Sequence, residues 1–386
     1  MSTQWITAFA AAQHQGFPQR SPSTAGKTLK AVIPSGLSGT AFRLVFAERY
    51  SPAPVQYGAI SVAVRGRKYP VLFGGNPQIT IRPGETVYSD PIACPLQNGD
   101  SLSLWIYNRG KVRSSSACMV PALISPPGNF CGLAFEPAVS KIPLPPGMPP
   151  GMPPGENLAG FVGIQILPIP GETPFAIAAF GDSITKMDFW VAPLREKIRR
   201  VTKEAALLNC GIGGNRLLRD THFSAAPKLR VFGDAGLARI RWDLLDHPGV
   251  RTVILALGIN DISQPKANPM SPPLKERCRL PELVSGYERF LQTARTAGLR
   301  VLGATITPFG GYVSHSPETE ALRQGANDWI KTAGAFDGVI DFAAAVCDPQ
   351  NPDALDPRYD SGDHLHPGPA GGQAMADLVQ VPLLLQ

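Results

Sequence analysis

The chain has 386 residues, of which 44% are hydrophobic and 17% are charged, a balance typical of folded proteins that excludes global disorder. Residues 1–171 carry 13 basic and 6 acidic side chains within a net charge of +6, but the basic residues do not cluster and no nucleic-acid-binding motif accompanies them, so no nucleic-acid partner is expected. No apolar run reaches the roughly 18 residues that cross a bilayer, so we expect no membrane partner.

The first 15 residues, MSTQWITAFAAAQHQ, lack the basic start and the apolar stretch of a secretory signal. A cytoplasmic location is therefore expected. Secretion stays open, because a truncated N-terminus would look the same.

Short strands separated by turns are predicted over residues 1–171. Apolar and polar side chains alternate in four segments, namely residues 42–47, 60–64, 79–81 and 102–106. A period of two places one face of a strand in a core and the other in solvent. Turn sequences such as Arg82-Pro83-Gly84 separate the segments, and no helical pattern occurs. We predict an antiparallel β-sandwich, jelly-roll-like in class, that serves as an accessory domain.

Residues 143–156 are rich in proline and repeat the unit Gly-Met-Pro-Pro. Proline has a fixed φ and no backbone N–H donor, so this segment is predicted to be an extended loop. Residues 160–168 have the pattern of one more strand. The loop is therefore assigned to the first domain, and the domain boundary is placed near residue 171.

Strand-like runs alternate with helical patterns over residues 172–386, which predicts a parallel sheet with helices on both faces. Strands are predicted at residues 176–180, 205–209, 252–257, 301–307 and 338–342, and helices at residues 190–201, 281–298, 317–333 and 369–380. Ligands bind such sheets at the carboxyl ends of the strands. Functional residues are therefore expected just after each apolar run.

Four short motifs lie at these predicted strand ends. Gly181-Asp182-Ser183 places a serine beside a helix N-terminus, where backbone N–H groups favour negative charge. The glycines of residues 211–215, GIGGN, let the backbone approach a substrate, and Asn260 in GIND can supply an amide donor. Asp363 lies three residues before His366. At that spacing its carboxylate can hold Nδ1 of the ring and leave Nε2 as a base.

In this order, the motifs GDSIT, GIGGN, GIND and DHLH resemble the four sequence blocks of the SGNH hydrolases, also called the GDSL esterase family. The resemblance covers residues 176–380. The segments GGNRLL, LARIRWDLLDHPGV, VLGATITPF and YDSGDHLHP are similar to a branch of arylesterases and acylhydrolases, which has an N-terminal β-domain and includes members from bacterial xylan-degradation clusters. The resemblance implies an α/β protein with a flavodoxin-like, three-layer α/β/α hydrolase domain over residues 172–386.

The resemblance also implies a Ser-His-Asp triad. Ser183 would be the nucleophile, His366 the general base, and Asp363 the residue that orients His366. The oxyanion hole would consist of the N–H groups of Ser183 and Gly214 and the side-chain amide of Asn260. No metal and no organic cofactor are implied.

A metal site is the main alternative for the DHLH motif. Asp363, His364 and His366 could ligate a metal, but no cysteine or further acidic partner lies near them in the sequence. The six cysteines form no CxxC pair and are expected to be free, buried thiols. His364 could replace His366 as the base, although only His366 has the three-residue spacing to Asp363.

Four further residues lie near the motifs. His222 is expected to be a loop residue rather than a second base. Arg216 either lines the site or pairs with Asp261. The family often has Asp-Gly after GDSIT, whereas this chain has Lys186-Met187.

The predicted function is a serine esterase that hydrolyses short-chain acyl esters, acetyl above all, on a sugar or oligosaccharide. The acetyl group and the sugar follow from the resemblance and not from any pocket residue. One alternative is an acylhydrolase directed at lipids or thioesters. The other is a carbohydrate-binding protein with an inert hydrolase domain. The acyl length, the alcohol and the oligomeric state stay open.

Overall fold

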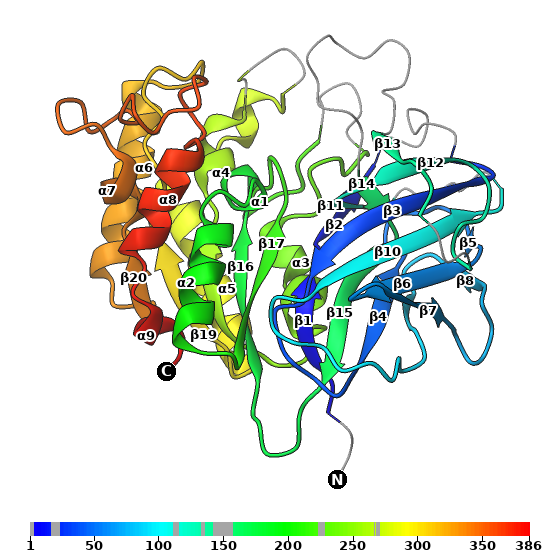
Figure 1. Cartoon of the computed structure of the whole chain (residues 1–386). Helices are drawn as coiled ribbons and strands as arrows, with labels where there is room; N and C mark the ends of the chain where they lie inside the picture. The colour runs from blue at the N-terminus through cyan, green and yellow to red at the C-terminus, as the bar shows by residue number, and fades with distance from the viewer. Residues whose placement is uncertain are drawn as a thin grey trace. The chain divides into compact units, whose positions relative to one another are not determined.

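A computed structural model of the chain describes residues 4–16, 24–110, 116–132, 136–141, 157–222, 228–265, 267 and 271–386. The chain divides into two compact units, Met1–Pro174 and Phe175–Gln386 (Figure 1). The predicted proline-rich loop at residues 143–156 lies outside the described residues. Within the described ranges, no helix has the length and apolar character needed to span a membrane.

Strands make up the regular structure that is described in the first unit. They are β1 (Ile6–Ala10), β2 (Gln13–Gln15), β3 (Lys27–Pro34), β4 (Ala41–Ala47), β5 (Val55–Tyr57), β6 (Ile60–Val64), β7 (Arg67–Val71), β8 (Ile79–Ile81), β9 (Thr86–Tyr88), β10 (Ser101–Asn108), β11 (Ser116–Pro121), β12 (Leu123–Pro127), β13 (Ser140–Lys141), β14 (Asn157–Ala159) and β15 (Phe161–Leu167). Their sheets have the orders β1-β15-β4-β9, β13-β12-β3-β10-β6-β7, β14-β11-β2 and β5-β8. The pairings described in these sheets are antiparallel, as predicted.

Strand β10 illustrates how its side chains are divided between two faces. Leu102, Leu104 and Ile106 are buried, as their alternation predicts. Trp105 points to the other face and is also buried. The ammonium groups of two lysines lie over its ring, Lys30 at 4.8 Å and Lys68 at 4.7 Å from the ring centre. These long side chains cover a ring that the simple alternation would leave in solvent.

The second unit alternates strands and helices. Its elements are β16 (Phe175–Gly181), α1 (Ser183–Lys186), α2 (Val191–Val201), β17 (Ala205–Gly211), α3 (Gly236–Ile240), the π-helix η1 (Arg241–Leu245), β18 (Val250–Ala256), α4 (Ile259–Ser263), the 3₁₀ turn η2 (Leu274–Glu276), α5 (Leu280–Thr296), β19 (Arg300–Ala304), α6 (Pro317–Thr332), β20 (Gly338–Ile340), α7 (Phe342–Val346), α8 (Pro369–Leu378) and α9 (Val381–Leu384). The parallel sheet has the order β17-β16-β18-β19-β20. In chain order this is 2-1-3-4-5, the order of flavodoxin-like sheets, so the predicted fold class is confirmed.

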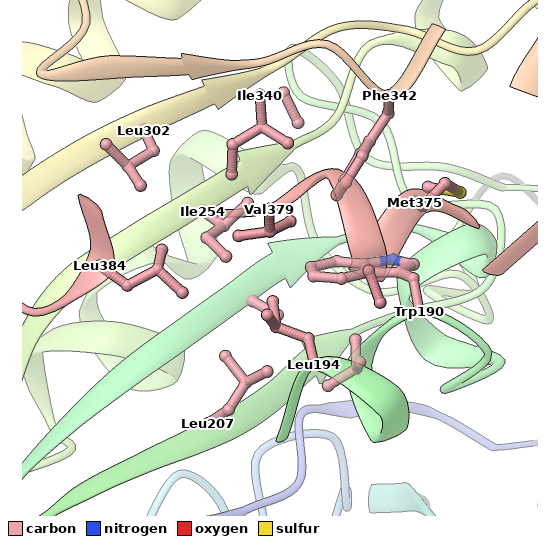
Figure 2. Close-up of a cluster of buried hydrophobic side chains, with 14 of the residues drawn as sticks. Trp190, Leu194, Leu207, Ile254, Leu302, Ile340, Phe342, Met375, Val379 and Leu384 are labelled. Atoms are coloured by element: carbon pink, nitrogen blue, oxygen red, sulfur yellow. The ribbon is translucent and has the colours of Figure 1, made fainter. Parts of the chain in front are cut away.

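Helices cover both faces of this sheet. Alternate residues of each strand point to opposite sides, so each face offers side chains on which helices pack. Ile177 and Ala179 of β16 pack into a cluster with side chains from α2, α7, α8 and α9. Figure 2 shows the cluster around Trp190, whose ring lies 5.0 Å from that of Phe342. Phe180, next in β16, contacts Phe290 of α5 on the other face, with ring centres 5.3 Å apart. The sheet is therefore the middle layer of three.

Strand β19 ends earlier than the predicted strand 301–307. The backbone leaves the sheet after Ala304. At Ile306 the side chain of Asn327 replaces a neighbouring strand: its Oδ1 accepts from the Ile306 N–H at 2.7 Å, and its Nδ2 donates to the Ile306 carbonyl at 2.9 Å. This tertiary contact has no signature in the periodicity. By contrast, the predicted end of α5 is confirmed, because Gly298 adopts φ 77° and the Leu299 N–H bonds the Ala294 carbonyl at 3.0 Å.

Candidate active site

The turn after β16 places Ser183 at the start of a helix. Asp182 caps α1, and its Oδ1 accepts from the N–H of Ile184 at 3.0 Å. Gly181 leaves room for this turn, since a Cβ at this position would lie 2.0 Å from the hydroxyl of Thr185. The serine hydroxyl is thereby presented at the carboxyl end of the sheet, where the sequence predicts it.

The structure brings Ser183, His366 and Asp363 together in one hydrogen-bonded chain. His366 Nε2 lies 2.8 Å from Ser183 Oγ, and His366 Nδ1 lies 2.6 Å from Asp363 Oδ2. The second oxygen of Asp363 accepts from the backbone N–H groups of Leu365 and His366, at 3.0 and 2.9 Å. A carboxylate on Nδ1 requires the proton there, which leaves the Nε2 lone pair directed at the serine.

Hydrogen bonds stabilise the negative charge of the Asp363 carboxylate beside His366. Partial burial acts to raise the pKa of this carboxyl, but the hydrogen bonds from the His366 ring and from the two backbone N–H groups outweigh it and lower the pKa to about 2. Asp363 is therefore ionised at neutral pH. An ionised carboxylate holds the ring and stabilises an imidazolium when one forms.

His364 lies outside this chain of hydrogen bonds. Its Nδ1 bonds the carboxylate of Asp360 at 2.6 Å, and its backbone has φ 62°. The two histidine rings are thus held by two different carboxylates. Among the residues that the structure describes, no group of three or more histidine, cysteine, aspartate or glutamate side chains is arranged to hold a metal.

Asn260 contacts the glycine block, residues 211–215, through a hydrogen bond to the Asn215 carbonyl. Gly214 has φ 70°, and a Cβ there would lie 2.6 Å from the ring of Phe232, so only glycine fits. Its carbonyl accepts from Gln264 Nε2 at 2.9 Å, which fixes the direction of the peptide. Asn260 is 4% exposed, and its Nδ2 donates to the Asn215 carbonyl at 3.1 Å. This bond uses one of the two amide hydrogens and orients the other.

Two backbone donors complete the set that the sequence implies. In the described part of the chain, the N–H groups of Ser183 and Gly214 donate to no protein acceptor. Unpaired N–H groups at a helix start and in a glycine turn are suited to bind a developing oxyanion.

Arg239 is a buried residue that the motifs do not reveal. Its side chain is fully buried and lies over the ring of Phe180, 3.7 Å from its centre. It donates to the Gly181 and Cys210 carbonyls, at 2.8 and 2.9 Å, at the ends of β16 and β17. Its Nε donates to Asn215 Oδ1 at 2.9 Å, and Asp243 balances its charge at 2.9 Å. The i, i+4 spacing of Arg239 and Asp243 in the sequence is compatible with this pair.

Arg216 pairs with Glu276 at 2.9 Å rather than with Asp261. The carboxylate of Asp261 instead accepts from the backbone N–H groups of Leu217 and Leu218, at 2.8 and 3.0 Å. His222 also contacts Glu276, at 3.3 Å, and takes no part in the Ser183 chain of hydrogen bonds. Both residues therefore organise the loop after the glycine block.

The six cysteines are unpaired, as expected, and are buried except for Cys347, which is partly exposed. Burial raises the pKa of Cys118 and Cys278 to about 12 and that of Cys131 to about 11. These three thiols are therefore protonated and unreactive at neutral pH.

A pocket lies at the carboxyl ends of β16, β18 and β19. Its walls are chiefly apolar and include Ile184, Trp190, Ala256 and Ile306. Asp182 also lines it. Burial raises the pKa of Asp182 to about 7, helped by the charge of Asp261 and opposed by the Ile184 N–H and Arg239.

Asp182→Asn is expected to stabilise the protein more at pH 7.5 than at pH 5. The folded-state pKa lies above the unfolded one of about 3.9, so this group's contribution to stability is complete below pH 4 and is lost as pH rises toward 7. The asparagine keeps the cap and removes this loss, roughly 2 kcal/mol between the two pH values. Urea unfolding at both pH values measures the difference, with the exposed Asp328→Asn as control. An equal effect at both pH values would contradict the prediction.

Comparison with known proteins bears on the second unit. Residues 179–374, about half of the chain, match the GDSL-like Lipase/Acylhydrolase family, and a comparison with curated proteins found no match. An acetylxylan esterase from Geobacillus stearothermophilus is 18% identical, with 53% of this chain and 91% of that chain covered and a TM-score of 0.38. A GDSL-like lipase from Bacteroides thetaiotaomicron is 16% identical, with 53% and 84% covered and a TM-score of 0.36. On the family match, this chain belongs to the GDSL-like lipase/acylhydrolase family, a family of carboxylic ester hydrolases.

Proposed function

We propose that the protein is a serine esterase whose triad is Ser183, His366 and Asp363. The observation that carries the proposal is the chain of hydrogen bonds from Ser183 Oγ through His366 to Asp363, at 2.8 and 2.6 Å. His366 Nε2 takes the serine proton as Oγ attacks the ester carbonyl. The imidazolium then protonates the leaving alcohol. Water, activated by the same nitrogen, releases the acid from the acyl-enzyme.

The tetrahedral oxyanion is stabilised by the N–H groups of Ser183 and Gly214 and by the amide of Asn260. All three donors are fixed before substrate arrives, by the start of α1, by the Gln264 bond to the Gly214 carbonyl, and by the Asn215 carbonyl. Preorganised donors need no reorganisation as charge develops, which makes them effective in the transition state.

The proposed substrates are acetyl esters carried by a saccharide. Support comes from the sequence segments shared with the arylesterase and acylhydrolase branch, among them YDSGDHLHP. Lys186 stands where the family often has aspartate, and burial lowers the pKa of its ammonium group. The lysine chain lies against Gly213, in the glycine block.

A chain-length series of 4-nitrophenyl esters, followed by acetate release from acetylated xylan, tests the substrate. Acetate esters are expected to have the highest kcat/KM, and acetylated xylan is expected to release acetate. A preference for long acyl chains, without acetate release from xylan, would instead favour a lipid- or thioester-directed acylhydrolase.

Asn260→Ala is expected to lower kcat by roughly 10²–10³-fold with a smaller change in KM, because the amide acts mainly on the transition state. Steady-state kinetics with 4-nitrophenyl acetate measures the two constants. Gln264→Ala is the comparison variant. It removes the hydrogen bond that holds the Gly214 carbonyl but leaves all three proposed oxyanion-hole donors in place. A large rise in KM at constant kcat would make Asn260 a substrate-binding residue.

A further inference from the structure

A second carboxylate–histidine pair lies two residues from the proposed base. His364 Nδ1 and Asp360 Oδ2 are 2.6 Å apart, the same separation as between His366 and Asp363. The carboxylate holds a proton on Nδ1, so in the neutral form of the ring the lone pair is on Nε2. The Asp360 side chain is 11% exposed and that of His364 is 55% exposed. The pair therefore consists of a largely buried carboxylate and an accessible imidazole ring.

The local backbone fixes the direction of this ring. Asp360 Oδ1 accepts from the N–H groups of Gly362 and His364, at 2.8 and 3.0 Å. His364 itself lies in the left-handed region, at φ 62°, which is uncommon for a residue with a side chain. One carboxylate thus holds both the backbone and the imidazole of the same residue.

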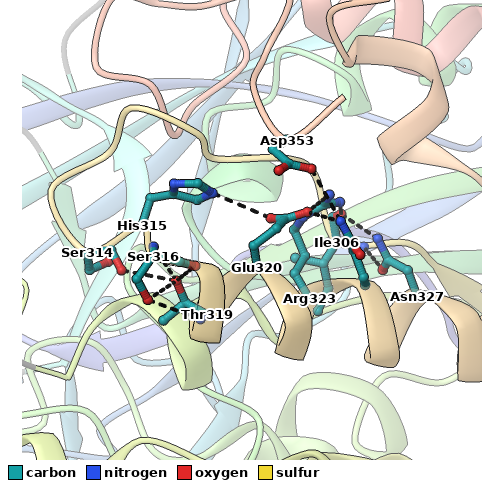
Figure 3. A network of polar contacts seen from close by, with 10 residues as sticks. Ile306, Ser314, His315, Ser316, Thr319, Glu320, Arg323, Asn327 and Asp353 are labelled. Carbon is teal, nitrogen blue, oxygen red and sulfur yellow. Dashed lines mark hydrogen bonds and ion pairs between the residues drawn. The ribbon is translucent and has the colours of Figure 1, made fainter. Parts of the chain in front are cut away.

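The ring also rests on the loop that follows β19. Gly311 has φ 92°, and a Cβ there would lie 3.1 Å from Cγ of the His364 ring. This loop is anchored on α6, as Figure 3 shows. Asn327 bonds both the N–H and the carbonyl of Ile306, and Arg323 donates to the same carbonyl at 3.2 Å while pairing with Glu320. The loop on which the His364 ring rests is therefore held in place by side chains of α6.

His364 is not needed as the base, since Ser183 Oγ already bonds His366 Nε2. In the described part of the chain, Nε2 of His364 takes part in no hydrogen bond or ion pair with a protein group. We propose that the Asp360–His364 pair binds a hydroxyl group of the substrate's alcohol portion, and so selects polyhydroxylated esters over aryl esters. The inference rests on the proposed function and specifies how that site would recognise a saccharide.

The chemistry of the pair fits such a hydroxyl. A neutral imidazole accepts a hydrogen bond at Nε2, and the carboxylate on Nδ1 strengthens that acceptor. Aryl esters such as 4-nitrophenyl acetate have no hydroxyl on the leaving group and cannot use it. A single hydrogen bond of this kind corresponds to a difference of roughly tenfold in binding.

The test compares His364→Asn with the wild type on two substrates, an acetylated xylo-oligosaccharide and 4-nitrophenyl acetate. Asparagine tolerates the left-handed backbone, so it removes the imidazole without adding strain. We expect KM for the saccharide to rise roughly tenfold, with a much smaller change in its kcat. The ratio of kcat/KM between saccharide and aryl ester should fall by a similar factor. Asp360→Asn should shift the same ratio in the same direction.

Equal losses on both substrates would assign the pair a structural role and overturn the inference. An unchanged saccharide KM in His364→Asn would also overturn it, and would leave the proposed esterase function intact. A wild-type protein that cleaves 4-nitrophenyl acetate but no acetylated saccharide would overturn the proposed substrate itself, and with it this inference.

Discussion

Ser183→Ala is expected to lower kcat for 4-nitrophenyl acetate by roughly 10⁴–10⁶-fold while the protein stays folded. The hydroxyl is the nucleophile in the proposed mechanism, and alanine leaves no group that can form the acyl-enzyme. The structural cost is small, because the change removes one hydroxyl and its hydrogen bond to His366. Such a bond contributes about 1 kcal/mol to stability.

Steady-state kinetics and thermal unfolding, measured on the same preparation, separate the two effects. Ser361→Ala is the matched control, since it removes a nearby hydroxyl that donates to Asp363 at 3.1 Å but is not a member of the Ser183–His366–Asp363 chain. We expect less than a tenfold loss for the control. A Ser183→Ala protein that keeps more than a tenth of the activity would refute the nucleophile assignment.

His366→Ala is expected to reduce kcat by a comparable factor, because Ser183 then has no base and the leaving alcohol no acid. His364→Ala should retain hydrolysis of 4-nitrophenyl acetate within an order of magnitude, since its ring is held by Asp360 and lies outside the triad. The two histidines are only two residues apart. The comparison therefore depends on which carboxylate each ring bonds and not on general damage to the loop.

Chelation is the complementary measurement for these histidine variants. Every step of the proposed mechanism uses a group of the protein or water, so EDTA is expected to leave the rate unchanged. A His364 variant as inactive as the His366 variant would contradict the triad. Activity removed by EDTA and restored by zinc would contradict it as well, and would favour the metal site considered for Asp363, His364 and His366.

The parallel sheet and the position of Ser183 at its carboxyl edge were predictable from the sequence because they depend on local pattern. The run at residues 176–180 appears as β16, and Ser183 follows it at the start of α1. The three-residue spacing of Asp363 and His366 also translates directly into a hydrogen bond. In each case the residues are close in sequence, so periodicity and spacing are sufficient to predict the contact.

The contacts that support this edge were not predictable, because they join distant segments. Arg239 bonds the Gly181 carbonyl, 58 positions away in the chain. Asn327 holds Ile306 where the strand was expected to continue. Arg216 was considered for a pair with Asp261 and instead bonds Glu276, 60 positions away. No periodic pattern encodes such partners, since each depends on how loops cross after the sheet has formed.

Covalent labelling at Ser183 is the measurement that tests the esterase mechanism most directly. The wild-type protein is incubated with a fluorophosphonate, digested and mapped by tandem mass spectrometry, with Ser183→Ala and His366→Ala treated in parallel. One phosphonate is expected on Ser183 in the wild type, none in Ser183→Ala, and much slower labelling in His366→Ala, because the serine is activated by its base. Labelling of a different residue, or no labelling of an active wild-type enzyme, would contradict the mechanism.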